Sequence, residues 1–139
     1  MKKLAAFLLV IGLAAGLYAQ DASDFEVELT KDGNGVIIKN YIGAVKDVVI
    51  PDTIDGVPVT EIAKAAFFRK RYITSVTLPV GISKIGATAF SFCNALVTVT
   101  VPDSVTKAID FGLGVFQGCT KLTIASQTAL KDRGYKGGF

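Results

Sequence analysis

The residue types that most often carry catalysis are sparse in this sequence of 139 residues, which contains two Cys and no His. The lack of His removes the commonest general base, the commonest zinc ligand and every His-dependent triad. Between positions 47 and 110 the acidic residues are scattered, and no spacing pairs two carboxylates for general acid and base work: Asp47, Asp52, Asp55, Glu61, Asp103 and Asp110. We therefore predict a protein that is not an enzyme and that uses no cofactor or metal.

Cys93 and Cys119 occupy equivalent places in two similar segments of the chain. If these segments stack, the two Cα atoms come near 5 Å apart, roughly within the 4.4 to 6.8 Å window of a disulfide. An oxidising compartment would permit that bond. Small buried thiols at a repeated inward position are nevertheless ordinary packing, which we favour. Redox catalysis would want a Cys-x-x-Cys motif, and the sequence has none.

Two glycine-containing segments resemble ligand loops only in part. Gly112-Leu113-Gly114 lacks the third glycine of a dinucleotide loop and follows no βαβ unit. Asp32-Gly33-Asn34-Gly35 begins like a calcium loop, but Val36 stands where the third oxygen ligand should be. A hairpin turn explains the second segment, and the first carries no site.

The densest charge cluster consists of Lys64, Arg69, Lys70 and Arg71, with Tyr72 directly after it. One interpretation is a solvated turn that keeps its face soluble. The other is a docking site for a sulfated glycan or an acidic patch of a protein. Nucleic acid is excluded as a general partner, because the formal net charge is only +3 and includes Lys2 and Lys3 of the leader described below.

An internal repeat must position these residues. The segment AKAAFFRKRYITSVTLP, residues 63–79, matches GATAFSFCNALVTVTVP, residues 86–102, at a constant offset of 23. A looser third copy keeps the spacing of Phe116, Cys119 and Leu122 at an offset of 26. We place the extra residues of this copy mainly within residues 110–114.

Each repeat predicts one strand, because apolar and polar residues alternate in SVTLP and TVTVP. Val76 and Val99 then face a core, while four residues face outward as polar rows: Ser75, Thr77, Thr98 and Thr100. An apolar hook at Ile62, Ile85 or Ile109 follows each strand, and one turn of helix or 3₁₀ helix is expected after it. Such coils bury their apolar sides only by stacking about 4.8 Å apart, which makes a solenoid.

These residues resemble the BspA-like, treponemal type of bacterial leucine-rich repeat. The pattern I-G-x-x-A-F-x-x-C-x-x-L-x-x-V-x-x-P is met at Ile85, Gly86, Ala89, Phe90, Cys93, Leu96, Val99 and Pro102. Lys70 replaces the Cys of the first repeat, and no Pro follows Leu122 in the third. The resemblance, which covers about residues 25–139, implies an α/β-type repeat solenoid: a right-handed coil with a short parallel sheet on one face. It also implies protein binding, with adhesion as the usual association.

The ends of the chain read as caps, because a solenoid must cover its terminal coils. Alternation between Phe25 and Leu29, followed by the turn at residues 31–35, predicts an N-terminal β-hairpin. At the other end Ser126 is expected to cap a short helix through Arg133, with Gly134 as the stop and Tyr135 and Phe139 folding back on the last coil.

The first twenty residues, MKKLAAFLLVIGLAAGLYAQ, read as a secretory signal peptide cleaved after Ala19. The polar sequence begins too soon for a spanning helix, and no Cys near the junction supports a lipid anchor. We therefore predict four parts: a signal peptide at 1–19, an N-terminal capping segment at 20–50, about three coils at 51–125 and a C-terminal cap at 126–139. The mature protein is expected in the periplasm, on the outer surface or outside the cell.

Two functions remain open at this point. The protein is an exported recognition module that adheres to host matrix or bacterial surface proteins, or a small envelope scaffold with partners in its own cell. An outer strand face of three or four strands offers roughly 300 Å², well below the ~800 Å² per partner of a standard interface. Binding through that face alone should be weak, and the threonines there also have a plain explanation as strand formers.

Overall fold

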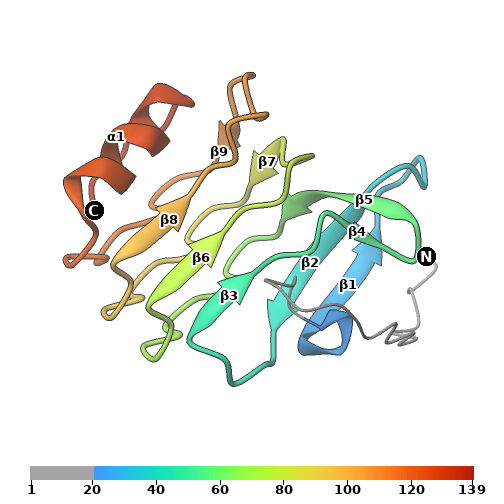
Figure 1. Cartoon of the computed structure of the whole chain (residues 1–139), viewed down its shortest axis with the longest axis horizontal. Coiled ribbons are helices and arrows are strands. Elements are labelled where there is room, and N and C mark those ends of the chain that lie inside the picture. The colour runs from blue at the N-terminus through green and yellow to red at the C-terminus, as the bar shows by residue number, and fades with distance from the viewer. Residues whose placement is uncertain (1–20) are drawn as a thin grey trace.

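The computed structural model describes residues 21–139, so the signal peptide predicted at residues 1–19 lies outside the described residues. One 3₁₀ helix, nine strands and one α-helix follow one another along this part of the chain (Figure 1): η1 (Ala22–Asp24), β1 (Phe25–Leu29), β2 (Val36–Tyr41), β3 (Asp47–Val49), β4 (Thr53–Ile54), β5 (Val57–Ile62), β6 (Ser75–Thr77), β7 (Lys84–Ile85), β8 (Thr98–Thr100), β9 (Asp110–Phe111) and α1 (Ile124–Asp132).

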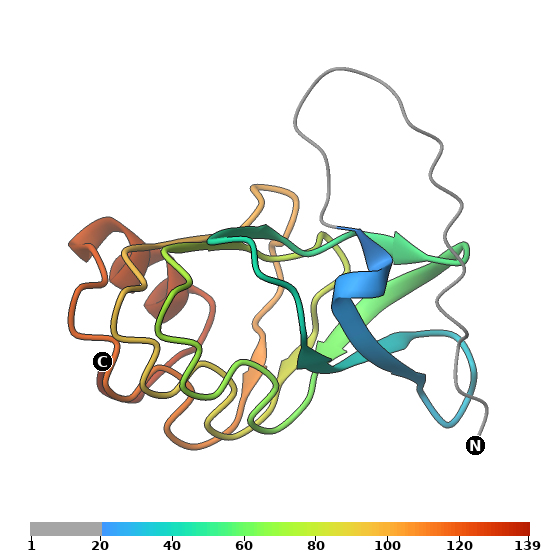
Figure 2. The same ribbon diagram turned by 90° about the horizontal axis from the view of Figure 1, so that it is seen from below.

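The chain winds through two sheets in alternation, so that each coil adds one strand to each sheet. The first sheet has the order β3-β6-β8 and is parallel throughout, which confirms the predicted short parallel sheet. The second has the order β1-β2-β5-β7-β9 and is parallel from β2 onward, with β4 paired to β5. The hooks at Ile62 and Ile85 form this second sheet. Figure 2 shows the coils as successive loops between the two ends of the molecule.

The offset of 23 residues between the two repeats is also the pairing register of the first sheet. In that sheet Ser75, Val76 and Thr77 pair with Thr98, Val99 and Thr100. The prediction for the third copy was wrong in one detail. Ile85 pairs with Phe111, not Ile109, so the extra residues lie before β9 rather than within 110–114. Both residues are apolar, and an alignment on residue type alone could not tell them apart.

The segments between the second and first sheets are tight turns, not the expected turn of helix or 3₁₀ helix. Their backbone hydrogen bonds do join residues three apart, as from the Ser91 amide to the Thr88 carbonyl. The turn cannot propagate, however, because two residues of each coil are left-handed, with φ of 55° at Thr88 and 58° at Phe92 in the second coil. The bends therefore reverse the chain without a helix.

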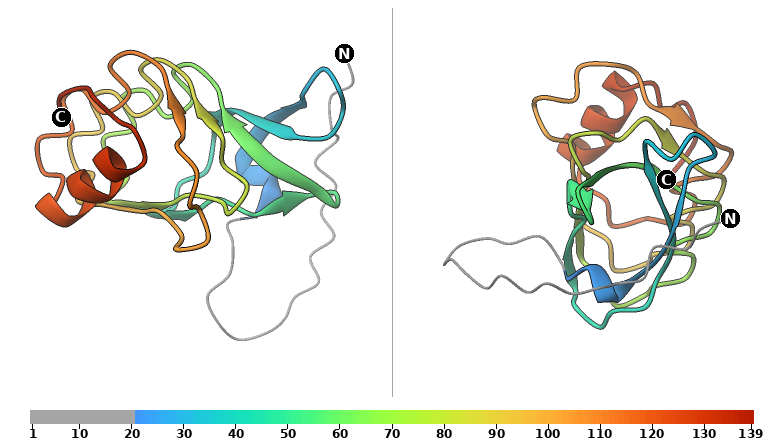
Figure 3. Two further views of the ribbon diagram at one scale, coloured as in Figure 1. Left: turned by 90° about the horizontal axis from the view of Figure 1, so that it is seen from above. Right: turned by 90° about the vertical axis from the view of Figure 1, so that its right-hand side faces the viewer.

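An aromatic column runs through the core along the whole stack. Phe67 lies 4.7 Å from Phe90 between ring centroids, and Phe90 lies 5.3 Å from Phe116, with near-parallel planes in both pairs. Tyr41 continues the column on Phe67 at 5.4 Å. The rings of Tyr41, Phe67, Phe90 and Phe116 are fully buried. The view along the stack in Figure 3 shows successive coils surrounding this shared interior.

The predicted N-terminal hairpin is confirmed: β1 pairs antiparallel with β2, and the Phe25 ring lies 5.3 Å from Tyr41. A second, two-residue hairpin joins β4 to β5 at Asp55 and Gly56, whose φ values of 51° and 78° suit a tight hairpin turn.

The C-terminal cap is confirmed in outline and corrected at its start. Thr123, not Ser126, is the N-cap of α1, and its side chain accepts a hydrogen bond from the Ser126 amide. Helix α1 ends at Asp132, and Gly134 follows with φ of 106°, as expected for a stop residue. The predicted fold-back is confirmed, because the ring of Tyr135 meets Phe116 edge-on at 5.2 Å.

Candidate functional site

The predicted basic cluster lies in the turns between β5 and β6, on the outside of a bend. Lys64, Arg69 and Arg71 are exposed, while Lys70 is half-buried at the position where later coils have a cysteine. The Arg69 amide donates to the Ser91 carbonyl at 2.9 Å, and its φ is 58°. We call the three corresponding turn segments, residues 64–72, 87–95 and 113–121, the bend surface.

Arg69 is held against two phenyl rings on this surface. Its guanidinium carbon lies 5.1 Å from the centroid of Phe68 and 5.9 Å from that of Phe92, within the range of cation–π attraction. The two rings meet edge-on, with centroids 6.1 Å apart and planes at 83°. Phe92 remains 37% exposed, so the arginine and the ring face solvent together.

Glycine makes room for the Phe92 ring. A Cβ atom at Gly118, the equivalent position of the third coil, would come within 2.6 Å of the ring, and the φ of Gly118 is 81°. The ring therefore lies over the backbone of the next coil.

Tyr72 borders the same surface. It is also 37% exposed, and its hydroxyl donates to the Gly43 carbonyl at 2.7 Å, which ties the first bend to the segment after β2. Desolvation raises the pKa of Tyr72, with smaller contributions from Cys93 and Asp24. The tyrosine thus serves as a neutral, fixed edge of the bend surface.

The predicted polar rows form the outer face of the first sheet. Ser75 and Thr98 lie in one row and Thr77 and Thr100 in the next, preceded in the register by Asp47 and Val49. The Asp47 carboxylate accepts hydrogen bonds from the Ser75 and Thr74 hydroxyls, both at 2.9 Å, and these bonds lower its pKa. The two predicted groups therefore lie on different sides of the coil. The basic cluster is on the bend, and the polar rows are on the strand face.

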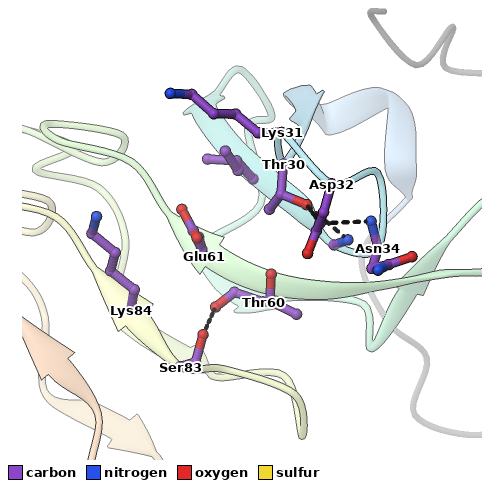
Figure 4. A pocket seen from close by; sticks show the side chains of 10 residues that line it. Thr30, Lys31, Asp32, Asn34, Thr60, Glu61, Ser83 and Lys84 are labelled. Atoms are coloured by element: carbon purple, nitrogen blue, oxygen red, sulfur yellow. Dashed lines mark hydrogen bonds between the residues drawn. The ribbon is translucent and has the colours of Figure 1, made fainter.

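A hollow of about 620 Å³ lies on the second sheet beside the turn between β1 and β2 (Figure 4). Lys31, Asp32, Glu61 and Lys84 bring charges of both signs to it. The Asp32 carboxylate is occupied by the turn, since it accepts from the Thr30 hydroxyl and the Asn34 amide, which lower its pKa.

Cys93 and Cys119 are free, fully buried thiols. The Sγ of Cys93 donates to the Phe67 carbonyl and that of Cys119 to the Phe90 carbonyl, both at 3.1 Å. Burial raises the pKa of Cys93 to about 12 and that of Cys119 to about 11. The thiols join successive coils and are not the reactive, low-pKa kind.

Sequence reasoning identified the basic cluster but missed its aromatic partners. The available signal was the second phenylalanine beside each core ring, Phe68 after Phe67 and Phe92 after Phe90. The core column needs one ring per coil, so the additional ring must lie elsewhere.

Residues 21–139 contain no group of three or more His, Cys, Asp or Glu side chains placed to hold a metal ion. Over the same residues, the one helix falls short of the length and apolar character that crossing a membrane requires.

Comparison with known proteins places the fold among bacterial repeat proteins. A protein-family model described as a BspA type leucine rich repeat region matches residues 40–131. A leucine rich cell surface protein from Faecalibacterium prausnitzii A2-165 is similar with a TM-score of 0.64 and 29% identity, over 78% of this chain and 30% of that one. A leucine-rich repeat protein from Bacteroides ovatus ATCC 8483 is similar with a TM-score of 0.57 and 26% identity, over 72% of this chain and 27% of that one.

A leucine rich repeat protein from T. pallidum aligns over 88% of this chain and 99% of its own, at 24% identity and a TM-score of 0.48. No curated protein gives a significant match. The chain thus spans less than a third of the length of the proteins from F. prausnitzii and B. ovatus.

Proposed function

The chain belongs to the family of BspA-type leucine-rich repeat proteins, which generally bind other proteins, and from this premise we propose that it is an exported, non-enzymatic recognition module. Its partners in this proposal are host matrix proteins or surface components of other bacteria. The observation that carries it is the closure of the apolar core by the chain's own two caps. Because Tyr41 and Phe116 are covered by Phe25 and Tyr135, the ends of the column need no partner, and the outer faces stay free for one.

The size of the strand face favours a contribution from a second surface. Three strands of three residues each cover roughly 140 Å² at ~4.8 Å between strands and ~3.3 Å per residue, below the expected 300 Å². A specific interface takes ~800 Å² per partner. The rows at Ser75, Thr77, Thr98 and Thr100 therefore act together with the bend surface, or in several copies whose avidity compensates for the area.

Export rests on the leader at residues 1–19, with its two lysines and apolar run. The similar protein from F. prausnitzii is described as a cell surface protein, which supports the same location here. We propose display on the outer surface or release from the cell, where adhesion is possible.

Two measurements test the proposal. Purified protein is passed over immobilised host matrix proteins and, in parallel, over the envelope proteins of its own cell. Intact cells are treated with protease to learn whether the protein is accessible from outside. Matrix capture together with protease sensitivity is the expected result. Capture by envelope proteins alone, with full protection in intact cells, would replace adhesion by a scaffold role within the envelope.

A further inference from the structure

The small net charge of the chain hides an uneven distribution of acidic and basic residues over its surface. The bend surface contains no Asp or Glu, so all 12 acidic residues of the chain lie outside it. Its three segments carry only positive charges: Lys64, Arg69, Lys70, Arg71 and Lys121. Segments that carry charges of one sign attract and orient a partner of the opposite sign, and the carboxylate of Asp24 acts only at the Tyr72 border.

Arg69 is the fixed point of this surface. Its backbone is held by the hydrogen bond to the Ser91 carbonyl, and its guanidinium lies against the rings of Phe68 and Phe92. No hydrogen bond joins the guanidinium to another described residue, so its N–H groups stay available. A guanidinium restrained by stacking presents a planar fork that matches a carboxylate with two parallel hydrogen bonds.

An exposed apolar edge accompanies the arginine. Phe92 is 37% exposed beside Arg69, and its ring lies over Gly118. Tyr72 is equally exposed, and its hydroxyl ties it to Gly43 at the border of the bend surface. Rigid aromatic rings beside an arginine are the composition enriched in the energetic centres of protein interfaces.

We propose that the bend surface docks an acidic protein segment in which carboxylates alternate with apolar side chains. Arg69 takes a carboxylate, and the ring of Phe92, which lies 5.9 Å from the guanidinium carbon, takes the apolar neighbour. This inference rests on the recognition role proposed above and gives it a site and a ligand chemistry. A sulfated glycan would satisfy the positive charges, but its polar surface would leave the exposed ring of Phe92 without an apolar partner.

The test measures binding of a short labelled peptide, in which glutamates alternate with leucines, to the full chain. The comparison probes are the same peptide with glutamines for glutamates and a heparin oligosaccharide. Wild-type protein should bind the glutamate peptide, bind the glutamine peptide far more weakly, and prefer the glutamate peptide to heparin. That affinity should fall as salt is added, because exposed charges are screened.

Three variants locate the site. Arg69→Lys keeps the charge but loses the stacked fork, and should weaken binding about tenfold, the usual loss for hydrogen bonds to a charged group. Phe92→Asn removes the ring while placing at the left-handed position a residue that tolerates it, and should also weaken binding. Lys107→Ala removes an exposed positive charge outside the bend surface and should leave the affinity unchanged.

Urea unfolding of each variant separates loss of binding from loss of fold. Equal affinity of Arg69→Lys and wild type would overturn the assignment of Arg69, and binding of heparin in preference to the peptide would replace the protein partner by a glycan. If the peptide fails to bind while matrix or envelope proteins are still captured, this inference fails and the recognition role stands. Failure of every probe and every protein would count against both.

Discussion

At the scale of single residues, the two thiols stabilise the stack as hydrogen-bond donors. Each Sγ reaches back to the carbonyl of the preceding coil, from Cys93 to Phe67 and from Cys119 to Phe90. The donors keep their protons well above physiological pH because burial raises their pKa values. A repeated cysteine in this fold therefore contributes through its proton, without a disulfide.

This arrangement predicts a loss of stability at alkaline pH. In the unfolded chain a thiol loses its proton near pH 9, whereas in the folded chain it keeps the proton up to about pH 11 for Cys119 and 12 for Cys93. Between these values the unfolded state binds fewer protons, so the free energy of unfolding falls as pH rises. Each thiol contributes about 1.4 kcal/mol per pH unit over that window.

The measurement is urea unfolding from pH 7 to pH 11, for wild type and for the double variant Cys93→Ala with Cys119→Ala. The variant should lose less stability above pH 9 than wild type, and its tyrosines provide the shared background. Parallel pH profiles would show that the thiols ionise alike in both states.

At the scale of the elements, α1 closes the open edge of the first sheet with a side chain. The Ser126 hydroxyl accepts the Val99 amide at 3.0 Å, and the Thr123 amide donates to the Val97 carbonyl at 2.9 Å. The helix thereby satisfies part of the edge of β8 that a further strand would have paired, which protects this end of the sheet from edge-to-edge association.

Ser126→Ala should lower the free energy of unfolding by about 1 to 3 kcal/mol, because it leaves the buried Val99 amide without an acceptor. Thr128→Ala is the matched control, since this residue is exposed on the same helix and the substitution should change stability by less than about 0.5 kcal/mol. Equal effects of the two substitutions in chemical unfolding would assign the closure to helix packing alone.

The elements that could be predicted from the sequence are those with a clear periodic pattern of apolar side chains. Alternation at Val76 and Val99 and the spacing of Phe67 and Phe90 determine the first sheet and the core. The second sheet was missed because β7 and β9 are two residues long, too short for any alternation. The helix cap was misplaced by three residues because Thr123 and Ser126 are both good caps, and only the position of Val99 shows which hydroxyl serves the strand.

The candidate site was predicted only as a charge cluster. Lys64 and Arg69 to Arg71 are visible in one segment, whereas Phe92 reaches Arg69 from the next coil. Both Arg69 and Phe92 have left-handed backbone, a conformation that neither residue type would lead one to predict.

At the scale of the whole molecule, the aromatic column makes the stability of each coil depend on its neighbours. Phe90 is packed on both faces, by Phe67 and by Phe116. Coils in such a stack gain most of their stability at the contacts with adjacent coils. Damage at the middle of the column should therefore weaken both halves of the molecule together.

Phe90→Ala should reduce the free energy of unfolding by about 3 to 5 kcal/mol, the range for removal of a fully buried aromatic ring. Leu113→Ala is the comparison, because this side chain is 86% exposed and its removal should change stability by less than about 0.5 kcal/mol. Chemical unfolding followed by tyrosine fluorescence measures both. A loss below about 1 kcal/mol for Phe90→Ala would mean that the column does not couple the coils.

The constant offset of 23 between residues 63–79 and 86–102 has a consequence for how such a protein can grow. Duplicating one unit inserts a complete rung, about 4.8 Å thick, while both ends of the molecule keep their sequence and their partners within the chain. Duplication of the stretch that encodes one unit would produce this change in one event. The length of the solenoid and the number of binding positions on it can thus differ by whole repeats between related proteins, while the fold stays the same.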